Sequence, residues 1–139
     1  MLDLLKQLYD ATVELIERKY PDGWGGASAM YTDKGTVITS ISPEVVNLST
    51  EMCFEVGCIC EAQKIGENIT HVVSVIRDDF QRNGIYEYKV VASCGVCQEM
   101  LFYWGNEVKC AVSNEKKEIV FKTLSELQPY YWRNAYSMK

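Results

Sequence analysis

Strand-like and helix-like segments alternate along the whole chain, and this alternation is the strongest constraint on its fold. The opening stretch places apolar residues every three or four positions, which predicts an amphipathic helix that ends at Pro21. The run His71–Ile76 is short, rich in β-branched residues and bounded by polar residues, which predicts a buried strand. Strands that alternate with helices usually form one sheet with helices on both faces. The predicted fold class is therefore α/β, a three-layer α/β/α arrangement around a five-stranded mixed sheet.

Turn and capping residues mark the other boundaries. Two strands, Ala27–Thr32 and Thr36–Ile41, are expected to form a hairpin, and the hydroxyls of Ser49 and Thr50 can cap a second helix. A third helix is expected to follow Cys94. The remaining predictions are helix ends at Gly66 and Gly105, a loop over Arg77–Gly84, a segment Ile85–Ala92 that returns toward the sheet, strands Glu107–Val112 and Glu118–Lys122, and a capping box at Thr123–Glu126 that begins a short last helix.

Length and charge limit the classes of function. A chain of 139 residues fits one domain over residues 1–139. Its 19 acidic residues exceed its 14 basic residues, and this net charge of −5 argues against a binder of nucleic acid or of an anionic membrane surface. No apolar run approaches the roughly 18 residues of a spanning helix, and the first residues lack the apolar core of a signal peptide. We therefore expect a cytoplasmic protein with no nucleic-acid and no membrane partner.

The six cysteines are the next constraint, because thiols stay reduced in the cytoplasm and then favour metal or redox chemistry over disulfides. Three of them lie in two short segments, Cys53-Phe54-Glu55 and Cys94-Gly95-Val96-Cys97. Each segment is expected in the first turn of a helix, where free backbone N–H groups and the helix dipole favour the thiolate that a metal requires. Three thiolates leave the fourth tetrahedral position of Zn²⁺ to water, as in catalytic zinc sites.

Glu55 completes this pattern. A carboxylate two residues from a ligand can face the open position without binding the metal, accept a proton from the activated water and pass it to a leaving group. An alternative is a redox dithiol formed by Cys94 and Cys97 between a strand and a helix, although it leaves Cys53 and Glu55 unexplained. Cys60 lies seven residues after Cys53 and is a candidate spare ligand.

At these residues the chain resembles the cytidine deaminase family, in the short form shared with blasticidin S deaminases. Cys-x-Glu followed by Cys-x-x-Cys is the signature of zinc-dependent nucleobase deaminases. The likeness extends to Gly26–Met30, which is similar to the family's Val-Gly-Ala-Ala-Leu strand, and to Leu127–Trp132, which is similar to the Leu-x-Pro-aromatic ending of the blasticidin S enzymes. It implies a cytidine deaminase-like fold and Glu55 as proton shuttle. The implied ligands of the Zn²⁺ cofactor are Cys53, Cys94 and Cys97.

The resemblance also implies substrate contacts. Glu44 occupies the place of a glutamate that holds the sugar hydroxyls, and Trp24 falls near an aromatic residue that packs on the pyrimidine. Ser42 stands where the family has an asparagine, two residues before that glutamate. The backbone carbonyl of Ala92 is expected to meet the amino group of the substrate. Trp132 is a further candidate for stacking on the substrate.

The function that these features predict is zinc-dependent hydrolytic deamination with release of ammonia. The small-molecule substrate is a free cytosine nucleoside, such as cytidine or deoxycytidine, or a cytosine nucleoside antibiotic such as blasticidin S. Family members of this length form homotetramers whose tails complete neighbouring sites. The resemblance therefore implies a homotetramer to which Tyr130–Tyr136 contributes.

Four residues depart from the family pattern. Ser42 replaces asparagine, Ser93 replaces proline, and Val56 and Gln98 occupy places where the family often has an arginine near the thiolates. These departures leave an alternative, a weak or inactive deaminase-like protein that binds nucleosides and keeps a structural zinc. Without such an arginine, the net negative charge of three thiolates on Zn²⁺ needs another source of compensation. The candidates are the two helix N-termini, Arg77, Arg82 and Lys64.

Overall fold

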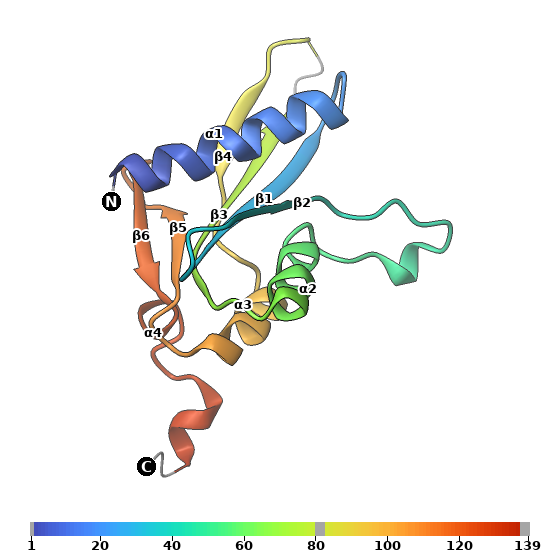
Figure 1. Ribbon diagram of the computed structural model, residues 1–139. Coiled ribbons are helices and arrows are strands. Elements are labelled where there is room, and N and C mark those ends of the chain that lie inside the picture. Colours follow the sequence, from blue (N-terminus) through green and yellow to red (C-terminus); the bar gives the residue numbers. More distant parts are fainter. Residues whose placement is uncertain (1, 80–82, 137–139) are drawn as a thin grey trace.

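The computed structural model describes residues 2–79 and 83–136, and in these ranges six strands form one mixed sheet between helices (Figure 1). The strands are β1 (Gly25–Thr32), β2 (Val37–Ser40), β3 (Ile69–Asp78), β4 (Glu87–Val90), β5 (Lys109–Ser113) and β6 (Ile119–Thr123). The α-helices are α1 (Leu2–Lys19), α2 (Val56–Ile65), α3 (Gly95–Leu101) and α4 (Leu124–Leu127). Short 3₁₀ turns lie at Leu48–Thr50, Phe102–Trp104 and Trp132–Ala135.

β3 is the central strand of the sheet, whose order is β2-β1-β3-β5-β6. One edge of β3 pairs antiparallel with β1 along nearly its whole length. The other edge is shared between two strands: β5 pairs in parallel with His71 and Val72, and β4 pairs antiparallel with the stretch from Val75 to Asp78. Parallel and antiparallel pairs thus occur in one sheet, which confirms the predicted mixed architecture.

Alternate residues of the central strands face two separate cores, because successive side chains of a strand point to opposite faces. The core beneath α1 contains Leu8, Ile16, Ala27, Ala29, Val73, Val75, Val90 and Ala111. The core on the other face, beneath α2 and α3, contains Met30, Ile38, Cys58, Ile59, Val72, Leu101 and Cys110 among others. Figure 1 shows α1 on one side of the sheet and α2 and α3 on the other, which confirms the three layers.

The predicted strand count of five was wrong, because β4 is a sixth strand. The sequence predicts a loop from Arg77 onward, but β3 continues through Arg77 and Asp78 and offers β4 an edge to pair with. In β4, Glu87 and Lys89 are exposed and Val90 is buried. Four residues with that alternation are too few to indicate a strand without knowledge of the partner.

The predicted start of the second helix was also wrong. Ser49 and Thr50 belong to the 3₁₀ turn Leu48–Thr50, where the Asn47 side chain accepts a hydrogen bond from the Ser49 backbone N–H at 3.1 Å. The chain then leaves that turn, and α2 begins only at Val56. Other boundaries match the predictions. The hairpin turns at Asp33–Gly35, the second and third helical segments end at Gly66 and Gly105 with φ of 73° and 102°, and Thr123 and Glu126 form the capping box of α4.

No helix in residues 2–79 and 83–136 has both the length and the apolar character that crossing a lipid bilayer requires.

Leu8 lies at the centre of the core that joins α1 to the sheet, so its truncation tests that layer. We expect Leu8→Ala to lower the free energy of unfolding by about 2–5 kcal/mol, since a buried leucine that becomes alanine leaves a cavity. Urea unfolding measures this loss. Gln7→Ala, at an exposed position of the same helix, is expected to change stability by less than about 0.5 kcal/mol. Equal losses in the two variants would contradict the assigned packing of α1.

Candidate active site

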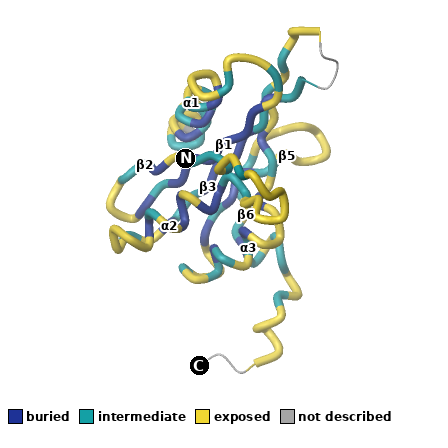
Figure 2. The backbone as a smooth tube through the Cα atoms, turned by 90° about the vertical axis from the view of Figure 1, so that its right-hand side faces the viewer, coloured by how far each residue is buried: buried dark blue, intermediate teal, exposed yellow. Residues whose placement is uncertain are grey.

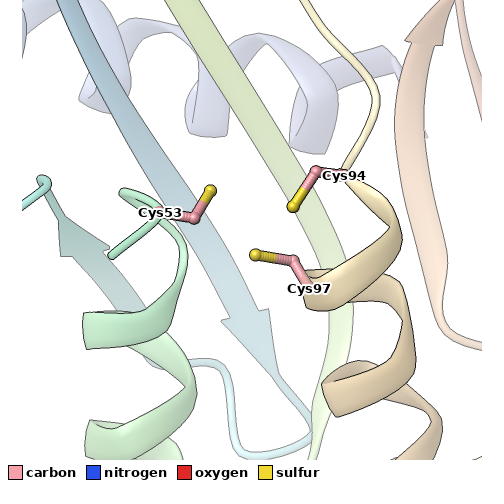
Figure 3. Close-up of side chains that lie close together, drawn as sticks. All are labelled: Cys53, Cys94 and Cys97. Carbon is pink, nitrogen blue, oxygen red and sulfur yellow. The ribbon is translucent and has the colours of Figure 1, made fainter. Parts of the chain in front are cut away.

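The structure brings together the three cysteines of the two segments. Cys53 precedes α2, Cys94 is the N-cap of α3, and Cys97 lies in the first turn of α3. Their side chains point toward one another (Figure 3), and the three Sγ atoms lie within 4.8 Å of one another. Zinc–sulfur bonds of 2.3 Å in a tetrahedron separate thiolates by about 3.8 Å, so a small inward movement of the side chains closes them around one ion. In the part of the chain that the structure describes, this cluster has the donor set and spacing that fit Zn²⁺.

Glu55 lies next to this cluster and is almost completely buried, at 1% exposure. Its Oε1 atom accepts a hydrogen bond from Ser74 Oγ at 2.6 Å. Its Oε2 atom is buried and has no hydrogen-bond partner among the residues that the structure describes. Burial raises the pKa of Glu55, and the polar side chains of Ser74, Ser93 and Cys97, with Ser74 first, oppose that rise. A buried oxygen without a partner is costly, so its place beside three thiols indicates a site that a water or a substrate completes.

The start of α2 is held against β2, and this contact sets the position of Glu55. Ser40 Oγ donates to the Phe54 carbonyl at 2.6 Å and accepts from the Cys58 backbone N–H at 3.0 Å. A Cβ atom at Gly57 would lie 2.7 Å from the Cβ of Ser40, so only glycine permits this approach. The helix therefore begins one residue after Glu55, with its first turn fixed to the neighbouring strand.

Electrostatics link Glu55 to the thiols. The pKa of the Cys97 thiol is raised by burial first and by the Glu55 carboxylate second. Burial also raises the pKa of Cys53. Without a cation these thiols keep their protons at neutral pH, so a metal that binds here has to displace them. The site therefore has acidic groups that a divalent cation would stabilise in their ionised form.

Two aromatic rings, those of Trp24 and Phe54, meet at Gly26. A Cβ atom at Gly26 would lie 2.9 Å from the rings of both Phe54 and Trp24, so these rings converge over a glycine that leaves room for them. Trp24 is 53% exposed and presents part of its ring to solvent. Glu44 is exposed, and its charge adds to burial in raising the pKa of Tyr20, which places it near the segment that carries Trp24.

The other residues expected to contact the substrate are Ser42, Ala92 and Trp132. Ser42 is half-buried in the segment after β2, and Ala92 is exposed in the loop before α3. Trp132 donates from Nε1 to Glu99 Oε1 at 3.1 Å, so the structure places it against the exposed side of α3. Its ring also contacts the ring of Tyr131. The contacts that the structure gives for Trp132 thus lie on α3 and within the C-terminal segment 128–136, called the tail below.

Comparison with family models and with curated proteins gives no match. Among solved structures, the chain is 50% identical to the cytidine deaminase from Bacillus anthracis, covering 94% of this chain and 91% of that chain, with a TM-score of 0.86. This chain belongs to the cytidine deaminase family. The cytidine deaminase from Mycobacterium leprae is 22% identical over 90% of this chain and 97% of that chain, with a TM-score of 0.67. The enzyme from Burkholderia pseudomallei is 16% identical over 90% and 96%, also with a TM-score of 0.67, and at these identities both support the fold alone.

In this cytidine deaminase fold, Gln98 is a neutral hydrogen-bonding link between two segments of the chain. Its Nε2 atom donates to the Ser93 carbonyl at 2.7 Å, and its Oε1 atom accepts from Gln128 Nε2 at 2.7 Å. Gln98 therefore fixes the residue before Cys94 and ties it to the C-terminal tail. Val56, the other position without arginine, is buried.

Two of the three basic residues considered for charge compensation, Arg77 and Lys64, are engaged elsewhere. The Arg77 guanidinium donates to two backbone carbonyls in the segment 20–23, at 2.7 and 2.8 Å. Lys64 pairs with Glu61 at 2.9 Å on the surface, and Arg82 lies outside the described residues. Of the candidates that the structure describes, the N-termini of α2 and α3 are the ones that lie at the thiols. The hypothesis that Cys60 is a spare ligand was wrong. Cys53 precedes α2, so Cys53 and Cys60 do not share a helical face, and Cys60 is not part of the cysteine cluster.

Sequence reasoning missed two residues of this site, Ser28 and Ser74. Ser74 contacts Glu55, and Ser28 lies opposite Ser74 in the β1–β3 pair. The available signal was a single serine in the apolar middle of each strand, within 27–30 and 72–76, at a position that faces α2. That signal becomes meaningful only when the register of the two strands is known.

The buried carboxyl group predicts how stability depends on pH in the metal-free protein. Between about pH 4.5 and the raised pKa of Glu55, the unfolded chain has lost a proton that the folded protein keeps. Stability therefore falls as pH rises through this window, by about 1.4 kcal/mol per pH unit. We expect Glu55→Gln to remove this dependence and to be more stable than the wild type at pH 7.

Urea unfolding of metal-free protein from pH 4.5 to 8 measures this difference. Glu61→Gln changes an exposed carboxylate of α2 and is expected to follow the pH profile of the wild type. Parallel profiles for Glu55→Gln and the wild type would contradict the raised pKa.

Proposed function

We propose that this protein is a zinc-dependent hydrolytic deaminase of a free cytosine nucleoside. The candidate substrates are cytidine, deoxycytidine and cytosine nucleoside antibiotics such as blasticidin S. The observation that carries the proposal is the buried Glu55, whose Oε2 atom lacks a partner in the described structure, beside three convergent cysteines. The 50% identity to a structure described as a cytidine deaminase supports the same reaction.

Each of these groups has a defined role in the proposed reaction. Cys53, Cys94 and Cys97 would hold Zn²⁺, which when bound supplies a Lewis acid that lowers the pKa of water to about 7. Glu55 accepts a proton from the water that attacks C4 of the ring and passes it to N3. It then moves the remaining proton of the new C4 hydroxyl to the amino group as the C4–N bond breaks and the C4 carbonyl forms. The products are a uracil nucleoside and ammonia. Burial suits Glu55 to this task, because a raised pKa lets the carboxyl group hold a proton near neutral pH.

The substrate contacts are part of the proposal. Trp24 stacks on the pyrimidine, which its place beside Phe54 and Gly26 supports. Glu44 and Ser42 bind the sugar, and the Ala92 carbonyl accepts from the amino group. Trp132, which lies in the C-terminal tail, would stack on the substrate. The acidic composition favours a small free substrate over a polynucleotide.

A substrate panel with metal analysis tests this function. We expect the zinc-loaded protein to release ammonia from at least one of cytidine, deoxycytidine and blasticidin S. Glu55→Gln is expected to lower kcat by about 10²–10⁴-fold, as for the loss of a general acid–base. The same variant is expected to keep the zinc content of the wild type, because Glu55 is not a ligand. Ammonia assays and elemental analysis on the same samples give both values.

Two cysteine variants provide the matched control for the metal. Cys97→Ser is expected to lose zinc and activity together, whereas Cys60→Ser, at an exposed position of α2, is expected to keep both. Zinc without turnover of any cytosine nucleoside would contradict the proposal and favour a nucleoside-binding protein. Loss of zinc in Glu55→Gln would contradict the role of the carboxylate. Activity that reduction abolishes in a metal-free protein would favour the redox dithiol.

We also propose that the protein functions as a homotetramer to which the tail contributes. Figure 2 shows the tail leaving the body of the molecule as an exposed segment. It carries Tyr130 and Tyr136 at 95% and 63% exposure, and exposed aromatic side chains of this kind are typical of interaction surfaces. Light scattering on the eluting protein is expected to give the mass of four chains, and removal of residues 130–139 is expected to lower it. A monomer at micromolar concentration would contradict this assembly.

A further inference from the structure

Two serines face each other in the centre of the sheet. Ser28 of β1 and Ser74 of β3 are partners in the strand register, and both are buried. They lie on the face that α2 covers, since Met30 and Val72, each two residues away along the strand, belong to the core beneath α2 and α3. A hydroxyl buried among apolar strand residues costs free energy unless it has a partner. The partners of these two hydroxyls therefore indicate their purpose.

The two hydroxyls form a chain that ends on Glu55. Ser74 Oγ lies 2.6 Å from Glu55 Oε1 and 3.0 Å from Ser28 Oγ. A hydroxyl has one proton to donate, and an ionised carboxylate only accepts, so the proton of Ser74 goes to Oε1. Ser28 Oγ lies beside Ser74 as the alternative acceptor of that proton, and its own proton goes to the Val73 carbonyl at 3.2 Å. Ser74 thus donates to Glu55, and Ser28 lies in contact with Ser74 and is itself held by the Val73 carbonyl.

This chain distinguishes the two oxygen atoms of Glu55. Oε1 can accept from Ser74 whether the carboxyl group is ionised or neutral, since a neutral group keeps acceptor capacity at its carbonyl oxygen. The terminal torsion of a glutamate side chain is broad, so burial alone does not fix the plane of the carboxylate. The hydrogen bond from Ser74 supplies that constraint and leaves Oε2 as the oxygen without a partner in the described structure.

We propose that Ser74, supported by Ser28, is a positioning residue for deamination that fixes the Glu55 carboxylate with Oε2 toward the reacting groups. The inference deepens the function proposed above and rests on it. Ser74 acts through Glu55 and touches neither the substrate nor the thiols. Its removal leaves substrate binding intact and lets the carboxylate rotate away from the geometry that proton transfer requires.

The test uses the zinc-loaded full chain. Ser74→Ala is expected to lower kcat by about 10–100-fold, with KM changed by less than about threefold, because a small misplacement of a catalytic group has effects of this size. Ser74→Thr keeps a hydroxyl on a strand and is expected to recover most of kcat. Ser28→Ala is expected to lower kcat by about threefold. The double variant is expected to be no slower than Ser74→Ala, since Ser28 acts through Ser74.

A second readout does not depend on turnover. An analogue with a hydroxyl on a tetrahedral C4 resembles the transition state and interacts with the proton shuttle, whereas the uracil nucleoside product lacks that hydroxyl. Ser74→Ala is expected to weaken binding of the analogue by about the same factor as kcat and to bind the product as the wild type does. Calorimetric titration of both ligands measures these affinities.

Thr70→Val is the matched control. Thr70 lies in the same strand, and its hydroxyl donates to the Tyr31 carbonyl at 3.2 Å. This variant is expected to keep the kcat of the wild type. An unchanged kcat in Ser74→Ala would overturn the role of the serines and leave the proposed function in place. Equal losses in Thr70→Val, or loss of zinc in Ser74→Ala, would show a structural role and overturn it as well. A wild type that deaminates no cytosine nucleoside would overturn both the proposed function and this inference.

Discussion

The site depends on a carboxylate held in the interior next to three thiols. Glu55 is 1% exposed, and one of its oxygens has no partner in the described structure, so its position is costly for the folded chain. Contacts from three elements keep the Glu55 side chain in this position despite that cost. β2 binds the turn at Phe54, β3 supplies the hydroxyl of Ser74, and α2 begins directly after Glu55. Stability given up at a functional group in this way is the usual relation between stability and activity.

The topology of the sheet explains why the two cysteine segments meet. α2 follows β2 and α3 follows β4, and both helices pack on the same face of the sheet, so their first turns lie side by side there (Figure 3). Close approach at this place needs residues without side chains. Gly57 lets α2 contact Ser40, and Gly26 makes room for the rings of Trp24 and Phe54. These two glycines thus permit α2 to lie against β2 and the two aromatic rings to lie against β1.

Most features that are local in the sequence were predictable, the helix cap expected at Ser49 and Thr50 being an exception, and features that depend on a distant partner were not. The periodicity of α1 and the capping box at Thr123 each lie within one segment, and the structure confirms them. β4 was missed because it forms only where β3 extends through Arg77, a charged residue whose donors are satisfied by backbone carbonyls. The cysteines and Glu55 could be identified because their chemistry is written in two short motifs. Ser28 and Ser74 could not, because their relation to Glu55 arises from strand register.

Because Val56 and Gln98 stand where the family often has arginine, the proposed metal site lacks a positive charge from these two positions. Gln98 is a neutral link between Ser93 and the tail, and the guanidinium of Arg77 is bound elsewhere. If Zn²⁺ is bound, three thiolates would give it a net negative charge that, among the candidates in the described residues, the helix N-termini reduce, and such a charge would raise the pKa of a bound water. A less acidic water needs a stronger and better-placed base. The burial that raises the pKa of Glu55 provides the first property, and the hydroxyl of Ser74 provides the second.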